Sequence, residues 1–485
     1  MRIGPGGHDL PDPVTGSAFE EANAASRGSA IKLLAEAAGR VLALATTVVI
    51  GRALAVSDFG LFGVVGAAAV VAAEVADFGL QGTAGRELVA RGFSIGALVR
   101  AKAVLLAVFG AGLAVLALLG PAGLLPPDLR GWLALFVPMA LFFVLAGWTE
   151  VLGVALRARG RRLEEALTIL CFRATLLLFA GLALGLRIGL GGLVWAHAAS
   201  PLPALALSAW LVARVQRGDP GGEPPMSVPA LLRRAFPLGA NGVLSLLSVR
   251  IELFVLGLWA TEQAAGLFNS ALNLVLPLLV VPTAICAGAM PALTREALRR
   301  EGPVRARTSL TLALLAAPAA AGLALVPGVV GLLFGGKYKD AAPTLRVLSM
   351  VVPVVFMNAL LLHALIAAGH AARVARLTAI RTVVAAVAAV VLIPRAGATG
   401  AALGFFAAEC TLFTLARAAC AQAEFPVSVV RPLGIGLVLT LPMVAVLALW
   451  RLPEPVAVAA GVLVYSVTLG VARWWKGVRK PAGSG

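Results

Sequence analysis

Several charged residues lie inside otherwise apolar segments, and their spacing places them on shared helix faces. Lys32, Glu36 and Arg40 follow one another at four-residue steps, so in a helix they form one stripe. Glu74 and Asp77 are three residues apart and also share a face. A basic stripe can hold an anion, whereas two neighbouring carboxylates can exchange protons or hold sodium. The chemistry indicated is the binding of ions, without the making or breaking of covalent bonds.

Further charged residues stand in later apolar segments. Arg250 and Glu252 are two residues apart, so in a helix they cannot face each other directly and more readily address a cavity or another helix. A charge inside a membrane bundle costs roughly 2.5–3.5 kcal/mol and therefore marks a functional candidate. The candidate cations for substrate binding are Arg40, Arg250, Lys32 and Arg173. The candidate carboxylates for coupling to an ion are Glu74, Asp77, Glu252 and Glu409.

Structural roles remain open for several of these residues. Lys32 and Glu36 can extend from a helix end to the membrane surface and pair with each other. Asp77 can instead be a turn residue, because a glycine follows it closely. Arg173 can form a structural ion pair with Glu150 of the neighbouring apolar segment.

The histidines and cysteines do not indicate a metal or a cofactor. His197 and His363 each stand alone in an apolar segment, which is more typical of a hydrogen-bonded core residue than of a metal ligand. The four cysteines also lie inside apolar segments and include no CxxC pair. No HExxH or Walker A motif is present. The sequence therefore predicts no metal, no cofactor and no direct use of ATP, and it does not indicate an enzyme.

The charged residues must be positioned by membrane-spanning helices, because the chain is too apolar for a soluble fold. Of its 485 residues 60% are hydrophobic and 13% are charged, and the mean hydropathy is +0.95. Soluble domains have about 45–50% apolar and about 25% charged residues. We expect an all-α polytopic membrane protein with about fourteen spans of roughly 20 residues each. The expected spans are 29–54, 59–80, 99–120, 129–156, 166–185, 188–213, 234–260, 263–290, 308–335, 342–369, 377–395, 399–420, 430–450 and 454–473.

The distribution of basic residues predicts the orientation of these spans. The net charge of +17 arises mainly between the apolar runs, so it indicates topology and contacts with lipid head groups, and no nucleic-acid partner. Counted over alternate connections, Lys and Arg divide 26 to 7. We therefore expect both termini in the cytoplasm and an even number of spans. The basic-rich side includes Lys102, Arg157, Arg305 and Arg381, and the other side includes Arg52 and Lys337.

Composition and a short repeat predict the domain organisation. Gly51 and the run Gly60-Leu61-Phe62 recur 206 residues later as Gly257 and Gly266-Leu267-Phe268, which indicates two six-helix units in parallel repeat. The expected parts are a disordered cytoplasmic tail (1–28), an N-terminal six-helix lobe (29–213), a cytoplasmic linker (214–233), a C-terminal six-helix lobe (234–420), two additional helices (421–475) and a cytoplasmic tail (476–485).

Three segments carry motifs of a known family. Gly51 to Gly92 contains D-F-G-L steps and a basic exit, Gly266 to Glu296 ends in a Pro and a basic loop, and Gly328 to His370 contains Phe-Gly-Gly-x-Tyr and Leu-Arg-x-Leu. Together they resemble the lipid-linked oligosaccharide (O-antigen-type) flippases of polysaccharide biosynthesis, relatives of MATE exporters and lipid II flippases in the MOP exporter superfamily. The chain departs from lipid II flippases, which carry further charges in the first span where this sequence has Thr46-Thr47.

The resemblance implies a function, a location and partners. It implies two lobes around a central cavity that turns an isoprenoid-pyrophosphate-linked oligosaccharide from the cytoplasmic to the outer leaflet of the bacterial inner membrane. Its partners would be this lipid-linked substrate, the lipid bilayer, and a polysaccharide polymerase with its export machinery. One alternative is a MATE-like multidrug antiporter, in which carboxylates should dominate the cavity. A membrane-embedded polymerase or ligase is disfavoured because the outward-facing loops are short.

Overall fold

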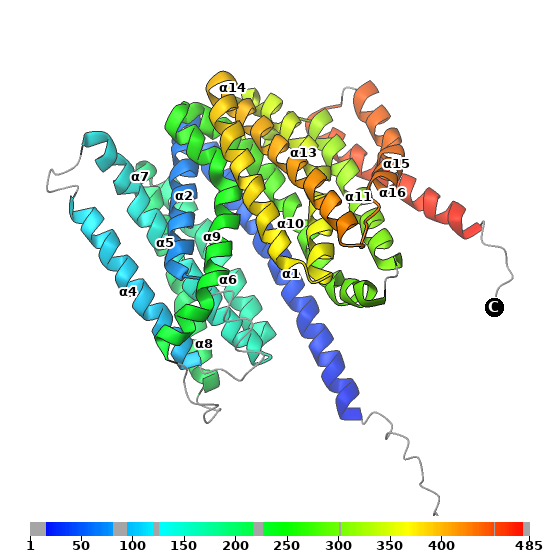
Figure 1. The fold of residues 1–485 in the computed structure, drawn as a ribbon. Coiled ribbons are helices and arrows are strands. Elements are labelled where there is room, and N and C mark those ends of the chain that lie inside the picture. Colours follow the sequence, from blue (N-terminus) through cyan, green and yellow to red (C-terminus); the bar gives the residue numbers. More distant parts are fainter. Residues whose placement is uncertain are drawn as a thin grey trace, which may run out of the picture.

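The computed structural model describes residues 16–80, 95–119, 126–216, 227–299, 302–450 and 452–478, and within these ranges it contains helices and no strand. Figure 1 shows the helices as a bundle from which the first part of α1 extends downward. The all-α membrane fold is therefore as predicted. The helices are α1 Gly16–Ala53, α2 Val56–Asp77, α4 Ile95–Leu119, α5 Pro127–Ala158, α6 Arg162–Gly185, α7 Gly189–Ala199, α8 Leu202–Gln216, α9 Val228–Trp259, α10 Glu262–Arg299, α11 Pro303–Leu325, α12 Val329–Phe334, the 3₁₀ helix η1 Gly336–Ala341, α13 Ala342–Ala367, α14 Ala371–Gln422, α15 Val430–Leu449 and α16 Glu454–Val478.

The described residues contain 13 helical segments that are long and apolar enough to cross a membrane. One of them, α14, has 52 residues, which is about 78 Å of helix against roughly 30 Å of hydrocarbon. It is broken at Gly397, whose φ of 50° and ψ of −125° are not helical. The two halves then run back along each other, because a Cβ on Gly400 would lie 2.2 Å from the Leu392 carbonyl oxygen. Counting α14 as two crossings gives the fourteen that the sequence predicts.

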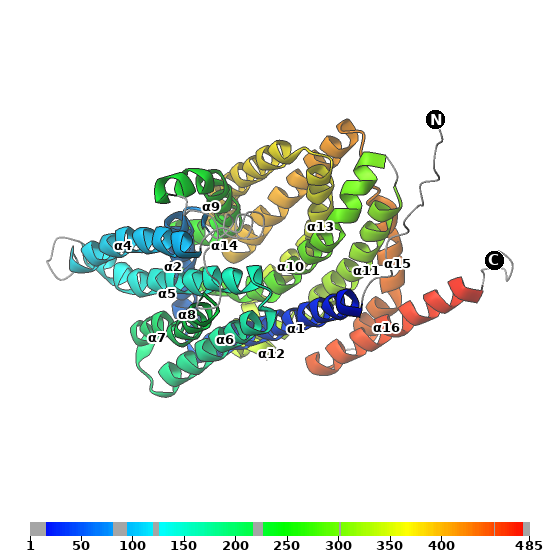
Figure 2. The same ribbon diagram turned by 90° about the horizontal axis from the view of Figure 1, so that it is seen from below.

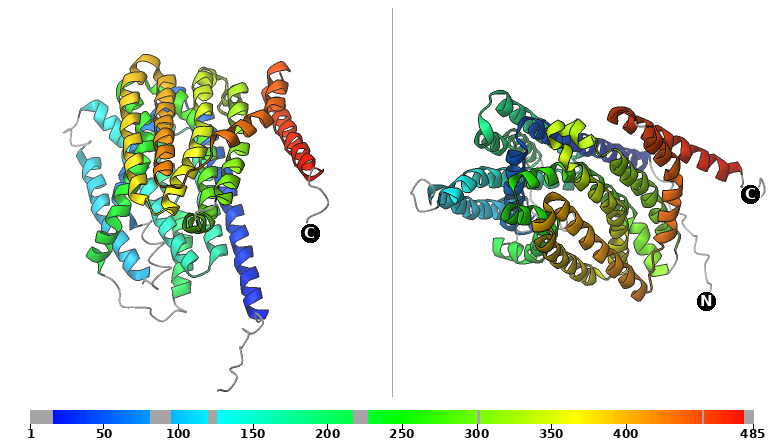
Figure 3. Two further views of the ribbon diagram at one scale, coloured as in Figure 1. Left: turned by 45° about the vertical axis from the view of Figure 1, so that its right-hand side comes forward. Right: turned by 90° about the horizontal axis from the view of Figure 1, so that it is seen from above.

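The helices pack in two sets. In the first bundle (residues 16–216), α1 packs on α6, and α2 and α7 pack on α5. In the second bundle (residues 228–422), α13 contacts α10, α11 and α14, and α9 packs on α14. Figure 2 shows α4, α5 and α7 on one side and α15 and α16 at the opposite edge, with α1 extending toward that edge. Helix α15 packs on α11. Figure 3 shows α16 at the edge of the molecule opposite α4 in two further views.

The repeated glycines lie where the two bundles touch. Helix α1 ends at Ala53 and α2 begins at Val56, while α9 ends at Trp259 and α10 begins at Glu262, each 206 residues later. A Cβ on Gly60 would be 1.9 Å from the Glu262 carbonyl oxygen, and a Cβ on Gly266 would be 2.0 Å from the Val56 carbonyl oxygen. The two contacts are equivalent under the repeat, so α2 and α10 meet near an approximate two-fold axis.

Three polar segments are more helical than we predicted. Residues 16–28 of the expected tail belong to α1, and residues 1–15 lie outside the described residues. The expected linker 214–233 overlaps α8 and α9 at its ends, and the polar stretch after residue 290 continues α10 to Arg299. These segments are rich in Ala, Leu, Glu and Arg, which favour helix at any polarity. Low hydropathy shows that these segments do not cross the membrane, but it does not show whether they are helical.

The predicted orientation can be tested with reporter fusions after residues 125, 220, 300 and 480. We expect cytoplasmic reporter activity from the last three and periplasmic activity from the fusion after residue 125, because the Lys and Arg residues favour that arrangement. A periplasmic reporter at residue 300 or 480 would overturn the orientation.

Candidate functional site

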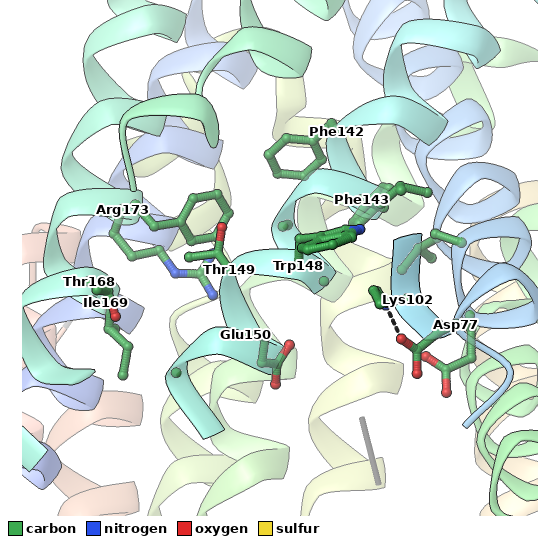
Figure 4. Close-up of a pocket in the computed structure, with 18 of the residues that line it drawn as sticks. Asp77, Lys102, Phe142, Phe143, Trp148, Thr149, Glu150, Thr168, Ile169 and Arg173 are labelled. Carbon is green, nitrogen blue, oxygen red and sulfur yellow. Dashed lines mark hydrogen bonds and ion pairs between the residues drawn. The ribbon is translucent and has the colours of Figure 1, made fainter. Parts of the chain in front are cut away.

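A cavity of about 520 Å³ lies within the first bundle, lined by α1, α2, α4, α5 and α6. Figure 4 shows Arg173 on one side of it and the Lys102–Asp77 pair on the other, with the indole of Trp148 between them. Aromatic side chains of α5 and α6 form part of the wall, among them Phe142, Phe143 and Phe172. The nine charged residues of the lining are Glu36, Arg40, Glu74, Asp77, Lys102, Glu150, Arg157, Glu165 and Arg173.

Two predicted cations, Arg40 and Arg173, line this cavity together. The Arg173 chain packs against α1 beside Arg40, because a Cβ on Gly39 would lie 3.4 Å from Cγ of Arg173. The Arg173 guanidinium lies 5.0 Å from the centroid of the Phe172 ring and interacts electrostatically with Glu150 and Arg40. Arg173 and Glu150, which the sequence suggested as a structural ion pair, therefore both lie in the cavity wall and interact there.

Asp77 and Lys102 form a buried ion pair between α2 and α4. Lys102 is 5% exposed and Asp77 is 6% exposed, so the two charges neutralise each other away from solvent. Lys102 stands near the start of the expected span 99–120, where it was counted as a basic residue of the cytoplasmic side; its pairing with Asp77 was not predicted. Helix α4 begins at Ile95, so Lys102 lies nearly two turns inside it.

A second ion pair joins α5 to α6. Nε of Arg157 donates a hydrogen bond of 2.8 Å to Oε1 of Glu165, whose side chain is buried. Arg157 had been assigned to the connection between these helices, and Glu165 was not among the predicted site residues. A basic residue in the last turn of one helix and an acidic residue in the first turn of the next form a recognisable signal for such a pair.

The cavity contains five carboxylates and four basic side chains. Two of the carboxylates and two of the basic side chains belong to these two ion pairs. The other charged residues of the lining are Arg40, Arg173, Glu36, Glu74 and Glu150. Glu74 also reaches the second bundle, because a Cβ on Gly242 of α9 would lie 2.3 Å from its Oε1. The cavity therefore combines both signs of charge.

Because the repeat makes the first and seventh spans equivalent, we expected Arg40 and Arg250 to meet across one cavity and to bind a pyrophosphate there. This is wrong, since Arg250 does not line the cavity that contains Arg40. It lies in α9, and its Nε is buried without a hydrogen-bond partner. Every lining residue of the cavity comes from the first bundle. Lys32 lies in α1 one turn before Glu36, but its side chain is outside the described ones.

The second bundle contains a buried polar cluster around Arg381. Nε of Arg381 donates to Oε1 of Glu409 at 2.7 Å, and Nδ2 of Asn358 donates to Oε2 of Glu409 at 2.7 Å. Nη1 of Arg381 also donates to the Ser248 carbonyl oxygen at 2.6 Å. Glu252 is 1% exposed, interacts electrostatically with Arg381 and Glu409, and has no hydrogen-bond partner for its Oε1. The two predicted coupling carboxylates of this bundle thus lie around one arginine.

Arg381 was counted among the basic residues of the cytoplasmic side, at the start of the expected span 377–395, and its place in a buried cluster was not predicted. Helix α14 begins ten residues earlier, and Arg381 is 4% exposed.

Among the described residues no group of three or more His, Cys, Asp or Glu could hold a metal ion. His197 packs against the rings of Phe62 and Phe142, with centroid distances of 5.3 and 5.2 Å.

No protein-family model and no curated protein matches the sequence. Solved structures do match. The lipid II flippase MurJ in its inward closed conformation has a TM-score of 0.66 and 12% identity, covering 92% of this chain and 99% of its own. An inward-facing multidrug resistance MATE family transporter of the MOP superfamily has a TM-score of 0.59 and 15% identity, covering 80% and 95%. This chain has the MOP fold.

The MOP fold agrees with the relationship to MATE exporters and lipid II flippases that the sequence motifs predict. A MOP superfamily transporter from Pyrococcus furiosus also matches, with a TM-score of 0.53 and 15% identity over 83% of this chain and 96% of its own. MurJ covers a larger share of this chain than either of the other two proteins. At these identities the likeness establishes the fold, and the type of substrate has to be argued from the site itself.

Proposed function

We propose that this protein is a secondary transporter that flips an isoprenoid-pyrophosphate-linked oligosaccharide from the cytoplasmic to the outer leaflet for the synthesis of a surface polysaccharide. The observation that carries the proposal is the pair Arg40 and Arg173 in a cavity of about 520 Å³ within a MOP fold. Guanidinium groups bind phosphate oxygens through two parallel hydrogen bonds. A pyrophosphate moved through the low-dielectric interior needs such counter-charges.

The carboxylates of the cavity fit the oligosaccharide part of this substrate. Sugar hydroxyls are hydrogen-bond donors, and Glu36, Glu74 and Glu150 provide acceptors beside the two arginines. The rings of Phe142 and Trp148 add apolar surface to the same wall. A lining of mixed charge is therefore suited to a head group that carries both phosphates and sugars.

A second pocket is suited to the lipid part. It has a volume of about 430 Å³ and lies where α15 approaches α11, α13 and α14. Its lining is almost wholly apolar and includes Ala320, Met350, Phe413 and Leu437. An isoprenoid chain gains about 0.8 kcal/mol for each CH₂ group that it buries, and it can do so here or in the surrounding lipid.

The contacts between the bundles leave one side more open than the other. Helix α2 packs along α9, where Glu74 lies against Gly242, and Gly79, just beyond the end of α2, lies against Gly239. Helix α1 makes few contacts with α10. The approximate two-fold axis relates these two helix pairs, so an opening between α1 and α10 breaks the symmetry. Such an opening lets a charged head group enter the cavity while its lipid tail stays outside.

For ion coupling we propose the two pairs of acidic residues that the sequence indicated as candidates. Glu74 and Asp77 lie in the cavity wall, and Glu252 and Glu409 lie in the cluster around Arg381. Glu252 is the strongest candidate, because a fully buried carboxylate oxygen without a hydrogen-bond partner is costly unless it carries a proton or an ion. We further propose the bacterial inner membrane as the location, with a polysaccharide polymerase and its export machinery acting on the flipped product.

Deletion of the gene in its host tests this function. We expect loss of one surface polysaccharide and accumulation of its lipid-linked unit on the cytoplasmic leaflet, because flipping follows assembly of the unit and precedes polymerisation. The measurement is lipid extraction with leaflet-specific labelling, and complementation with the intact gene is the control. Failure to assemble the unit would instead indicate an enzyme.

The three carboxylates beside the arginines also favour a second candidate, a MATE-like multidrug antiporter with a cationic cargo. In that case the deletion strain would keep all its surface glycans and become sensitive to cationic drugs.

A further inference from the structure

The C-terminal ends of α1 and α12 are capped by each other's basic residues. A helix leaves its last carbonyl groups without intrahelical partners, and cations are favourable there. Nε and Nη2 of Arg52, at the end of α1, donate to the carbonyl oxygens of Leu333 and Leu332, at the end of α12. Nζ of Lys337, just beyond α12, donates to the carbonyl oxygens of Arg52 and Leu54.

The same two segments share a buried aromatic contact. The ring centroids of Phe59, Phe334 and Tyr338 are 5.7 to 5.9 Å apart, and none of the three side chains is exposed to solvent. The Tyr338 hydroxyl donates a hydrogen bond of 3.0 Å to the Gly51 carbonyl oxygen. A Cβ at Gly51 would lie 2.5 Å from Cδ1 of Phe334, so this close approach requires glycine.

These contacts join the first bundle to the second at the end of α1 remote from the cavity. The lining residue of α1 nearest to them is Arg40, twelve residues before Arg52, which is about 18 Å along the helix axis. Arg52 and Lys337 both belong to the side that is poor in basic residues, the side predicted to face outward. In a transporter whose two bundles part on the outward side, the end of α1 has to separate from α12 and η1, because these contacts join the two bundles there.

We propose that α12 and η1 form a latch that keeps the cavity closed on the face carrying Arg52 and Lys337, and that this latch must release before the cavity opens there. The proposal rests on the alternating access of the proposed function, but it concerns closure and is independent of the cargo. The polar part of the latch is suited to release, since Arg52 and Lys337 are exposed and water can replace each of their hydrogen bonds at small net cost. The buried rings of Phe334 and Tyr338 must separate from Phe59 when the latch opens.

The latch can be tested by the accessibility of a cavity cysteine. In a chain whose four native cysteines are replaced by alanine, Val70→Cys places a thiol in the cavity wall. A membrane-impermeant charged maleimide is applied to right-side-out and, separately, inside-out vesicles. Adding Lys337→Ala or Tyr338→Phe should raise the labelling rate roughly fivefold from the face that carries the latch, since each change removes donors worth about one net hydrogen bond or more.

Lys339→Ala is the matched control, because Lys339 lies in the same short helix without a hydrogen bond to α1 among the described residues. It should label like the parent. Equal labelling of parent and Tyr338→Phe, with both proteins monodisperse, would overturn the latch; that variant keeps the ring and settles the matter even where Lys337→Ala does not insert. A response in labelling by a protein that flips no lipid-linked oligosaccharide would support the latch and contradict the proposed cargo.

Discussion

Replacing Arg381 with alanine is expected to destabilise the protein strongly. Arg381 is 4% exposed and its guanidinium holds Glu409 and the Ser248 carbonyl group. Removing one partner of a buried ion pair leaves the other charge without compensation, at a cost of about 3–5 kcal/mol. Here the cost falls on two acidic groups, because Glu252 is also close to Arg381.

The expected result is a melting temperature in detergent at least about 5 °C below the parent, with a smaller yield of monodisperse protein. Arg376→Ala is the control, since Arg376 is exposed on the same helix one and a half turns earlier. The double variant Arg381→Leu with Glu409→Leu should be more stable than Arg381→Leu alone, because two apolar side chains leave no unpaired charge at either site. Strictly additive losses in the double variant would show that the two residues do not act as a pair.

The spans could be predicted from the sequence because they depend on a property that each segment carries alone. Runs of about 20 apolar residues identified the crossings, including the two halves of α14, where Pro394 and Gly397 separate the runs. The repeat that contains Gly60 and Gly266 was also visible in the sequence, although the contact between these two glycines was not predicted. Both inferences needed only local composition and periodicity.

The site was predicted less completely, because it depends on where helices begin and on how they rotate. Lys102 and Arg381 were counted with the basic residues at the cytoplasmic ends of the expected spans 99–120 and 377–395, yet α4 and α14 begin seven and ten residues before them. A polar first turn or two gives a helix no hydropathy signal. The buried partners of these residues, Asp77 and Glu409, were recognised only as isolated charges in apolar segments.

Arg250 shows a different limit of sequence reasoning. Under the repeat of 206 residues Arg40 corresponds to Leu246, and Arg250 lies four residues beyond it. Four residues move a side chain about 6 Å along a helix and about 40° around it. Equivalent helices therefore did not make Arg40 and Arg250 equivalent residues, and the partner of Arg40 in the cavity is Arg173, on the helix that packs against α1.

Removing the guanidinium of Arg40 or Arg173 is expected to reduce flipping of the lipid-linked oligosaccharide about tenfold or more while the protein still folds. A hydrogen bond to a charged group contributes about 1.5–3 kcal/mol, and each tenfold change in rate corresponds to about 1.4 kcal/mol. Both side chains line the cavity, so their loss leaves an enlarged wet space and no buried charge without a partner. Lysine at either site should restore only part of the rate, because an ammonium cannot bind two phosphate oxygens in parallel.

The measurement is flipping of a fluorescent lipid-linked oligosaccharide in proteoliposomes that contain equal amounts of inserted protein. Arg346→Ala is the matched control, since Arg346 is exposed on α13 and does not line the cavity. Alanine variants that flip at the parent rate would remove the two arginines from the mechanism. The multidrug alternative makes the opposite prediction: loss of Arg40 or Arg173 would leave the carboxylates Glu36, Glu74 and Glu150 in excess and should strengthen cation export, because the repulsion between arginine and a cationic cargo would be gone.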